Sequence, residues 1–168
     1  MQTPTQRGFT LIEVMVVAAI VSILALIAVP SFQSRIIRTQ VAEGLVLADL
    51  ARQGVASYYA KTGKLPPDNL AAGLPPADRI VGKYVSEVAV RNGAIHIRFG
   101  NQANGNLSRK LVTLRPAVVP DYPQVPITWV CSAAPAPEKM KTMGEDATDL
   151  AIQYLPLDCL ARPVTAGK

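Results

Sequence analysis

The stretch RGFTLIEVMVVAAIVSILALIAVP, from Arg7 to Pro30, decides how the rest of the chain is organised. Between Phe9 and Val29 it holds 21 residues, and Glu13 is the only charged one among them. A helix of that length is about 30 Å long, which matches the hydrocarbon core of a bilayer. The run is longer than the apolar core of a secretory signal, and no small-residue cleavage pattern closes it. The sequence therefore predicts a membrane-spanning helix.

Glu13 is an unusual residue for such a helix. A carboxylate at the centre of a bilayer costs about 2.5–3.5 kcal/mol on insertion scales, and less near an interface. Because Glu13 lies four residues past Phe9, near one end of the run, a simple anchor could tolerate it. The alternative is that its partner is an amine on another chain, available only after a cut. The residues alone leave both explanations open.

The overall composition describes one domain with an appended element. The chain has 168 residues and a formal net charge of +5, which permits contact with anionic surfaces without requiring it. No nucleophile and base stand at the spacing of a catalytic motif, and no glycine-rich phosphate loop follows a strand. One histidine, His96, and two cysteines do not suffice for a conventional zinc site. We therefore expect neither catalysis nor a metal or cofactor.

The two cysteines, Cys131 and Cys159, both fall in the last quarter of the chain. In a membrane-anchored chain, two isolated cysteines suggest one disulfide in an oxidising compartment. Two unpaired buried thiols are the alternative.

Apolar residues continue at helical spacing after Pro30. They recur three, four or seven residues apart while charged residues fall elsewhere, so one helix should run from Phe9 to about Thr62. Pro30 should kink or locally unwind this helix because proline lacks the backbone N–H, and Gly63 is placed to cap its C-terminus. The apolar stripe consists of Ile37, Val41, Leu45, Ala48, Val55 and Tyr59.

A β-hairpin follows a proline-rich loop at residues 63–82. In KYVSEVAVRNGAIHIRFG, Asn92-Gly93 is a strong signal for a two-residue turn, which fixes the register of the flanking strands. The apolar side of the hairpin should pack on the helix stripe, and the other side, with His96, should face solvent. On the apolar side the register pairs Val90 with Ile95, Val88 with Ile97 and Ser86 with Phe99; on the other side it pairs Arg91 with Ala94, Ala89 with His96 and Glu87 with Arg98.

Two further strands are predicted, at residues 108–115 and 127–131. Trp129 should be a core anchor near the cysteines rather than a platform for a ligand. The predicted fold class is α+β, with a long N-terminal helix packed on a four-stranded antiparallel sheet.

The short polar leader ending in Arg7-Gly8, followed by Phe9-Thr10-Leu11-Ile12-Glu13, resembles the processing site of type IV pilins. That resemblance implies a leader peptide at residues 1–8, which a prepilin peptidase removes by cutting between Gly8 and Phe9. It also implies N-methylation of Phe9 by the same enzyme. In that family the glutamate that matches Glu13 pairs with the terminal amine of a neighbouring subunit.

The second half of the chain is similar to the type IVa subfamily. The similarity covers GKYVSEVAVRNGAIHIRFG, the WVC that ends at Cys131, and the QYLPLDC that ends at Cys159. It implies that these two cysteines close a variable, exposed loop called the D-region, residues 131–159. The implied division is a leader (1–8), a hydrophobic transmembrane and assembly helix (9–30) and a globular domain (31–168).

The resemblance implies a structural subunit of a surface fibre used for adhesion, twitching motility or DNA uptake. The expected partners are identical or related subunits, the prepilin peptidase and methyltransferase, an inner-membrane assembly platform, and DNA or host surfaces. The precursor would be a single-pass inner-membrane protein and the product an extracellular fibre. One alternative is a minor pilin that acts as a DNA receptor. Another is a type II secretion pseudopilin, against which the cysteine pair counts.

The distribution of charge indicates where a DNA contact would lie. Between Arg79 and Arg115 seven basic residues stand against Glu87 alone, a net charge of +6, whereas the residues between the cysteines carry −3. A nucleic-acid contact should therefore use the sheet, with Arg109 and Lys110 as candidates. No aromatic cluster accompanies these residues, so stacking on bases is not predicted.

Overall fold

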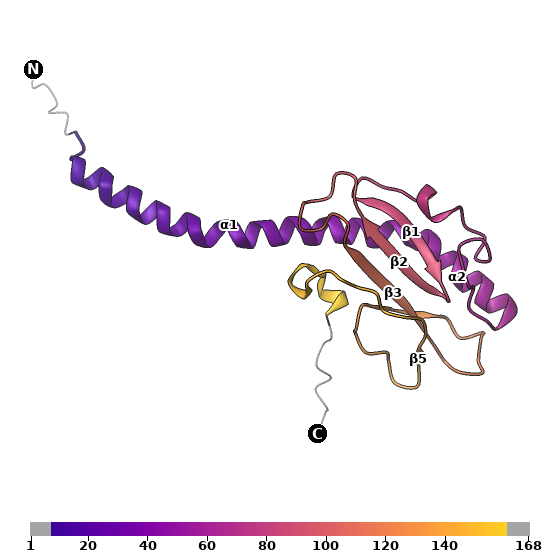
Figure 1. The fold of residues 1–168 in the computed structure, drawn as a ribbon. Coiled ribbons are helices and arrows are strands. Elements are labelled where there is room, and N and C mark those ends of the chain that lie inside the picture. Colours follow the sequence, from indigo (N-terminus) through magenta and orange to yellow (C-terminus); the bar gives the residue numbers. More distant parts are fainter. Residues whose placement is uncertain (1–7, 161–168) are drawn as a thin grey trace, which may run out of the picture. The chain divides into compact units, whose positions relative to one another are not determined.

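The computed structural model describes residues 8–160, apart from the side chains of residues 27–31 and 158 (Figure 1). The chain divides after Arg35 into two compact units, Met1–Arg35 and Ile36–Lys168. The elements follow one another as two helices, a run of strands and short 3-10 turns. This order gives the α+β class that the sequence predicts.

Two consecutive helices replace the single predicted one. Helix α1 spans Leu11–Leu47 and helix α2 spans Asp49–Thr62, so the helical region begins two residues later than expected and is interrupted at Ala48. The interruption is slight, because the Ala48 amide still donates to the Gly44 carbonyl at 3.1 Å. Helix α1 is continuous through Pro30. The helix therefore does not unwind locally at Pro30, and a kink there stays a prediction.

The end of α2 follows the predicted capping pattern. Gly63 adopts the left-handed conformation with φ 67°, and its amide donates to the Tyr59 carbonyl at 2.8 Å. The predicted apolar stripe is confirmed, because all its members except the half-buried Leu45 are buried. The buried members are Ile37, Val41, Ala48, Val55 and Tyr59.

The sheet has the strand order β1-β2-β3-β4, all antiparallel, with a short β5 that also pairs with β3. It therefore has five strands rather than the predicted four. The strands are β1 (Val85–Arg91), β2 (Ala94–Phe99), β3 (Leu111–Val118), β4 (Thr128–Cys131) and β5 (Lys141–Thr142). Short 3-10 turns occupy Ala77–Arg79, Ile152–Tyr154 and Leu157–Cys159.

The hairpin register is confirmed from the turn outward to Glu87, which pairs with Arg98. The prediction that Ser86 pairs with Phe99 is wrong, because the register shifts between Val85 and Glu87 and Val85 takes that place. The extra residue forms a bulge. It brings a valine rather than a serine onto the apolar side, opposite the buried Phe99.

The outer edge of β1 is covered by the proline-rich loop. Asn69 Oδ1 accepts a hydrogen bond from the Val90 amide at 2.6 Å. Asn69 Nδ2 donates to the carbonyls of Val88 at 3.1 Å and Pro75 at 3.0 Å. Near the hairpin turn, Asn92 and Gly93 donate their amides to the carbonyls of Pro67 and Pro66. The loop therefore satisfies backbone groups that an edge strand would otherwise leave open.

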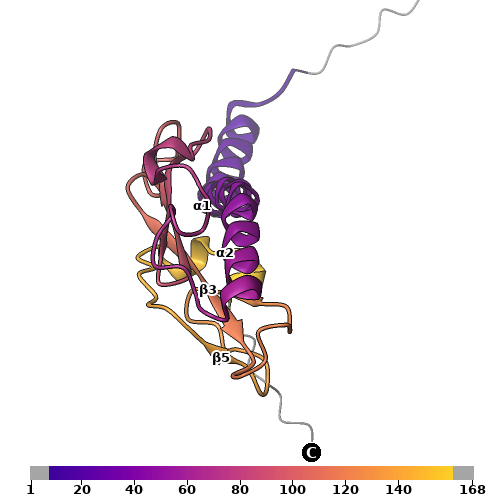
Figure 2. The same ribbon diagram turned by 90° about the vertical axis from the view of Figure 1, so that its right-hand side faces the viewer.

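The two sides of the sheet are covered by different parts of the chain (Figure 2). The helices of the Ile36–Lys168 unit lie on one side. The other side, predicted to face solvent, is instead partly covered by the C-terminal loop, so Ala94, Thr113 and Ala117 are fully buried. His96 lies on this side and is 7% exposed, so the prediction of a solvated histidine is wrong.

Candidate functional site

Residues 8–10 precede the first helix and have no regular structure. They are exposed, and Phe9 is 82% exposed. The peptide bond between Gly8 and Phe9, where the sequence predicts cleavage, therefore lies outside the helix. Residues 1–7 of the predicted leader lie outside the described residues.

Thr10 and Glu13 cap the N-terminus of α1 through reciprocal hydrogen bonds. The Thr10 amide donates to Glu13 Oε2, and the Glu13 amide donates to Thr10 Oγ1, both at 3.4 Å. This is the capping box, in which a threonine and a glutamate three residues later satisfy two unpaired helix amides. The sequence analysis missed it, although the pattern Thr10-x-x-Glu13 was the available signal. Glu13 therefore has a local role in addition to the predicted role between subunits.

The described part of the N-terminal run keeps its apolar side chains on the surface. All of its large apolar side chains are between 52% and 82% exposed. Within the described residues, no helix combines the length and the hydropathy needed to cross a membrane. The exposed side chains are Phe9, Leu11, Ile12, Val14, Met15, Val16, Val17, Ile20, Val21, Ile23, Leu24 and Leu26.

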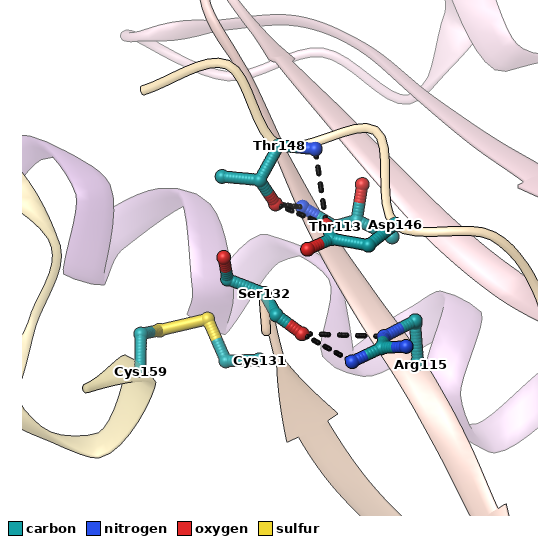
Figure 3. The surroundings of a disulfide bond; sticks show 7 residues. All are labelled: Thr113, Arg115, Cys131, Ser132, Asp146, Thr148 and Cys159. Atoms are coloured by element: carbon teal, nitrogen blue, oxygen red, sulfur yellow. Dashed lines mark hydrogen bonds between the residues drawn. A yellow bond between two sulfur atoms is a disulfide. The ribbon is translucent and has the colours of Figure 1, made fainter. Parts of the chain in front are cut away.

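A disulfide joins Cys131, at the end of β4, to Cys159 (Figure 3). Both residues are buried and belong to the core. Trp129, predicted as a core anchor, is half-buried and packs against this core. The disulfide therefore ties the end of the C-terminal loop to an edge of the sheet.

The loop that the disulfide closes is held on the sheet by directed hydrogen bonds. The Arg115 guanidinium donates to the Ser132 carbonyl through Nη2 at 2.7 Å and through Nε at 3.2 Å. Further along, the Thr148 hydroxyl accepts the Thr113 amide at 3.0 Å and donates to Asp146 Oδ1 at 2.6 Å (Figure 3). The predicted exposed loop is thus attached to β3 at two places.

His96 lies beneath this loop. Its Nδ1 is 3.0 Å from Thr113 Oγ1, the atom that also accepts the Ala147 amide at 3.2 Å. Burial lowers the pKa of His96 below its ordinary value, and the positive charge of Arg91 acts in the same direction. The sequence gives one weak signal for this site, because small residues such as Ala94 surround His96 on a side of the sheet that reads as polar.

Two basic residues in and beside the sheet have acidic partners. Arg98 Nε lies 2.8 Å from Glu87 Oε1, which confirms the predicted cross-strand ion pair. Lys110 Nζ lies 3.9 Å from Asp149 Oδ2 of the loop. Arg109 is exposed and precedes β3. A DNA contact at Arg109 and Lys110 stays a prediction. The two ion pairs weaken it, because they neutralise part of the positive charge that would attract DNA.

Comparison with known proteins decides the family. The pattern of the family described as Pilin (bacterial filament) matches residues 37–160 of the chain. The chain belongs to the pilin family. The pattern described as the prokaryotic N-terminal methylation motif matches residues 3–29 of this pilin. The resemblance to pilins that the sequence indicates is therefore confirmed.

Curated relatives agree over most of the chain. This pilin is 36% identical over 160 residues to the type IV major pilin protein PilE1 of Neisseria gonorrhoeae, covering 92% of this chain and 87% of that one. It is 34% identical over 162 residues to a fimbrial protein of Neisseria meningitidis serogroup B, covering 92% and 94%. It is 47% identical over 85 residues to the fimbrial protein EcpC of Eikenella corrodens, covering 51% and 54%. These relatives identify it as a type IV pilin of the type IVa kind.

Proposed function

We propose that this pilin is a major structural subunit of a type IV pilus and that it polymerises through its N-terminal helix into an extracellular fibre. The observation that carries the proposal is the exposed apolar surface between Phe9 and Leu26. A helix that is apolar all round is stable only where lipid or protein covers it. A membrane can cover it in the precursor, and copies of the same helix can cover it in the fibre. The protein acts by assembly and not by catalysis.

Processing precedes assembly in this proposal. A prepilin peptidase cuts between Gly8 and Phe9, and the new terminus at Phe9 is methylated. The match of the methylation motif to residues 3–29 supports this step. So does the exposed, non-helical stretch at residues 8–10, because a peptidase needs an accessible, extended bond.

The cut also creates the proposed partner of Glu13. A positive amine at Phe9 that is buried among apolar helices without a counter-charge costs several kcal/mol. Glu13 of an adjacent subunit neutralises it, and the offset between the two residues sets the axial stagger of each newcomer. Within its own chain, the Glu13 carboxylate accepts the Thr10 amide through Oε2.

The route to the fibre runs through the inner membrane. The precursor is a single-pass protein there, with the leader at residues 1–8, the assembly helix at 9–30 and the globular domain at 31–168. An assembly platform in the same membrane extracts the mature subunit into the fibre. The long apolar run in the sequence supports this membrane stage.

Replacement of Glu13 tests the proposal. Glu13→Val makes the helix more apolar, so membrane insertion and cleavage after Gly8 should persist while sheared fibres are lost. Ser22→Val is the matched control, because it also replaces a polar residue of the run by valine but removes no charge. Fibre yield should stay normal in that variant. Normal fibres from Glu13→Val would refute the role between subunits.

A second variant separates processing from assembly. Gly8→Glu should leave a full-length, membrane-bound precursor and no fibre. Mass spectrometry of the wild-type fibre should find a chain that begins with N-methylated Phe9. A mature chain with another first residue would refute the proposed cleavage site.

A further inference from the structure

The segment Gly144–Asp149, called the strap below, crosses β3 on the side opposite the helices. At one end, β5 pairs with Ala117 and Val118 of β3. Ala117 also pairs with Thr128 of β4, so β5 and β4 lie on opposite edges of β3. At the other end of the strap, Asp149 exchanges hydrogen bonds with Leu111, and Thr148 accepts the Thr113 amide. The β2 edge of β3 is already occupied at these positions, so the strap has passed to the opposite edge.

His96 lies at this crossing. Its partner across the strands is Thr113, and the Thr113 hydroxyl joins the imidazole on one side to the Ala147 amide of the strap on the other. Thr113 is fully buried and His96 nearly so. At the start of the strap, the Cα of Gly144 packs against Ala94, so closely that an added Cβ would lie 2.7 Å from the Ala94 Cβ. The strap therefore seals a histidine, whose charge state is sensitive to ordinary changes in pH.

The charged groups around the ring do not favour a positive charge on the imidazole. Arg91 of β1 and Arg98 of β2 face it from the sheet, and Glu145 and Asp146 face it from the strap. Arg98 is already paired with Glu87. Burial lowers the pKa of His96 most, the two arginines lower it further, and the two carboxylates offset only part of the effect. At neutral pH, which is above the ordinary pKa of histidine, the ring is therefore neutral when the strap is closed.

We propose that His96 is a proton-sensitive latch: its neutral ring holds the strap closed on the sheet, and its protonation releases the strap. The Cys131–Cys159 disulfide ties the ends of the loop to the fold, so the release is local and reversible. Each release takes up one proton from water, on the imidazole, and breaks no covalent bond.

The direction of the pH effect follows from the lowered pKa. The open strap leaves the imidazole in water with its ordinary pKa of about 6.5, so the open state binds a proton more readily than the closed one. The closed state is fully favoured above that pH and is progressively lost as the pH falls toward the lowered value. The opening equilibrium then rises by about tenfold for each unit by which closure lowers the pKa.

Amide hydrogen exchange on the full-length, untagged chain in detergent micelles tests the latch. Exchange is compared between about pH 7.5 and about pH 5, a range that spans the ordinary pKa of histidine, after correction for the intrinsic pH dependence of exchange. Peptides that contain Ala147 and Asp149 should lose protection at the lower pH. Peptides of β2 should keep theirs. Because the readout comes from the isolated chain, it does not depend on fibre assembly.

His96→Gln supplies the decisive comparison, because glutamine keeps a hydrogen-bonding side chain but cannot titrate in this range. Its strap should have the same protection at both pH values. Asp146→Asn should increase the acid-induced opening, since it removes a carboxylate that favours the protonated ring. A strap that opens equally with acid in His96→Gln would overturn the proposal and assign the opening to the carboxylates.

A second measurement needs no variant. His96 is the only histidine of the chain, so its imidazole resonance in an NMR titration is assigned at once. Its pKa should lie below the ordinary value, and its titration should coincide with the loss of protection in the strap. An unshifted imidazole, or a strap that stays protected after the imidazole has titrated, would refute the latch.

Discussion

The sheet domain buries its large apolar side chains, whereas the N-terminal run exposes them. Leu114 in β3 is 1% exposed, whereas Leu24 in the N-terminal run is 61% exposed. The first belongs to a core of the domain itself, and the second lies on a surface that lipid or another protein would have to cover. The comparison shows that one chain can hold a domain whose stability is its own and a helix whose stability depends on its surroundings.

Leucine replacement in the two regions should give the largest difference. Leu114→Ala should lower the free energy of unfolding of the domain by about 2–5 kcal/mol, because it leaves a cavity in the core. Leu24→Ala should change it by less than about 0.5 kcal/mol while it lowers fibre yield. Urea unfolding of the full-length chain in detergent, followed by the fluorescence of Trp129, measures the stability of both variants. Equal losses of stability would erase the distinction between the regions.

Removal of the disulfide should have the next largest effect. Cys131→Ser combined with Cys159→Ser releases a loop closed over a sequence separation of 28. The expected loss is about 3–4 kcal/mol on the loop-entropy account. The same unfolding assay measures it, and free-thiol labelling of the native wild-type chain should detect neither cysteine. Full labelling of both would contradict the bond.

A glycine replacement in the strap should have a smaller effect. Gly144 has φ 79°, and an added Cβ would come within 2.7 Å of Ala94. Gly144→Ala should therefore cost about 1–3 kcal/mol through strain and overpacking. Gly73→Ala is the matched control, because Gly73 has a similar φ of 70° but an added Cβ there meets nothing within 4 Å. Urea unfolding measures the stability of both variants. Similar losses would show that the strap does not pack tightly against β2.

The cross-strand ion pair should contribute less again. Glu87→Gln removes the partner of Arg98, and both side chains are partly exposed. The expected loss is about 0.2–1 kcal/mol and should shrink at high salt. A loss that did not change with salt would indicate that hydrogen bonding rather than charge holds the pair.

Changes at the candidate DNA contact should alter stability least. Arg109→Gln combined with Lys110→Gln should change the free energy of unfolding by less than about 0.5 kcal/mol. If the pilin binds DNA, this variant should bind more weakly on every sequence and with a flatter salt dependence. Lys139→Gln combined with Lys141→Gln should matter less, because the loop is net acidic. The reverse ranking would place a DNA contact on the loop.

The parts of the fold that could be predicted are those that local chemistry decides. Asn92 and Gly93 both adopt positive φ, 48° and 83°, so the turn fixes the register from two residues. The bulge at Ser86 could not be predicted, because it depends on which side chain fits opposite Phe99. The covered side of the sheet was missed for a related reason. The strap offers few apolar residues and is held through backbone groups and the Thr113 hydroxyl, which leave no periodic signal.

The site divides in the same manner. The cleavage motif around Gly8 and the cysteine pair could be read from the sequence because each is a fixed pattern of residue types. The capping box at Thr10 and Glu13 was also readable and was overlooked, since the long apolar run made Glu13 look isolated. The position of His96 depends on a loop that lies about fifty residues further along the chain, which no spacing rule connects to it.

The covered edge of β1 has a consequence for a protein that accumulates at high local concentration. An exposed strand edge is a template on which identical chains add strand after strand, the route to irreversible aggregates. Asn69 occupies the Val90 amide and the Val88 carbonyl with a side chain, so that edge offers an approaching chain nothing to pair with there. In the proposed fibre, crowded subunits that cannot pair through this edge associate through their helices. A single asparagine in a loop thus helps to protect the subunits of a pilus from aggregation through paired strands.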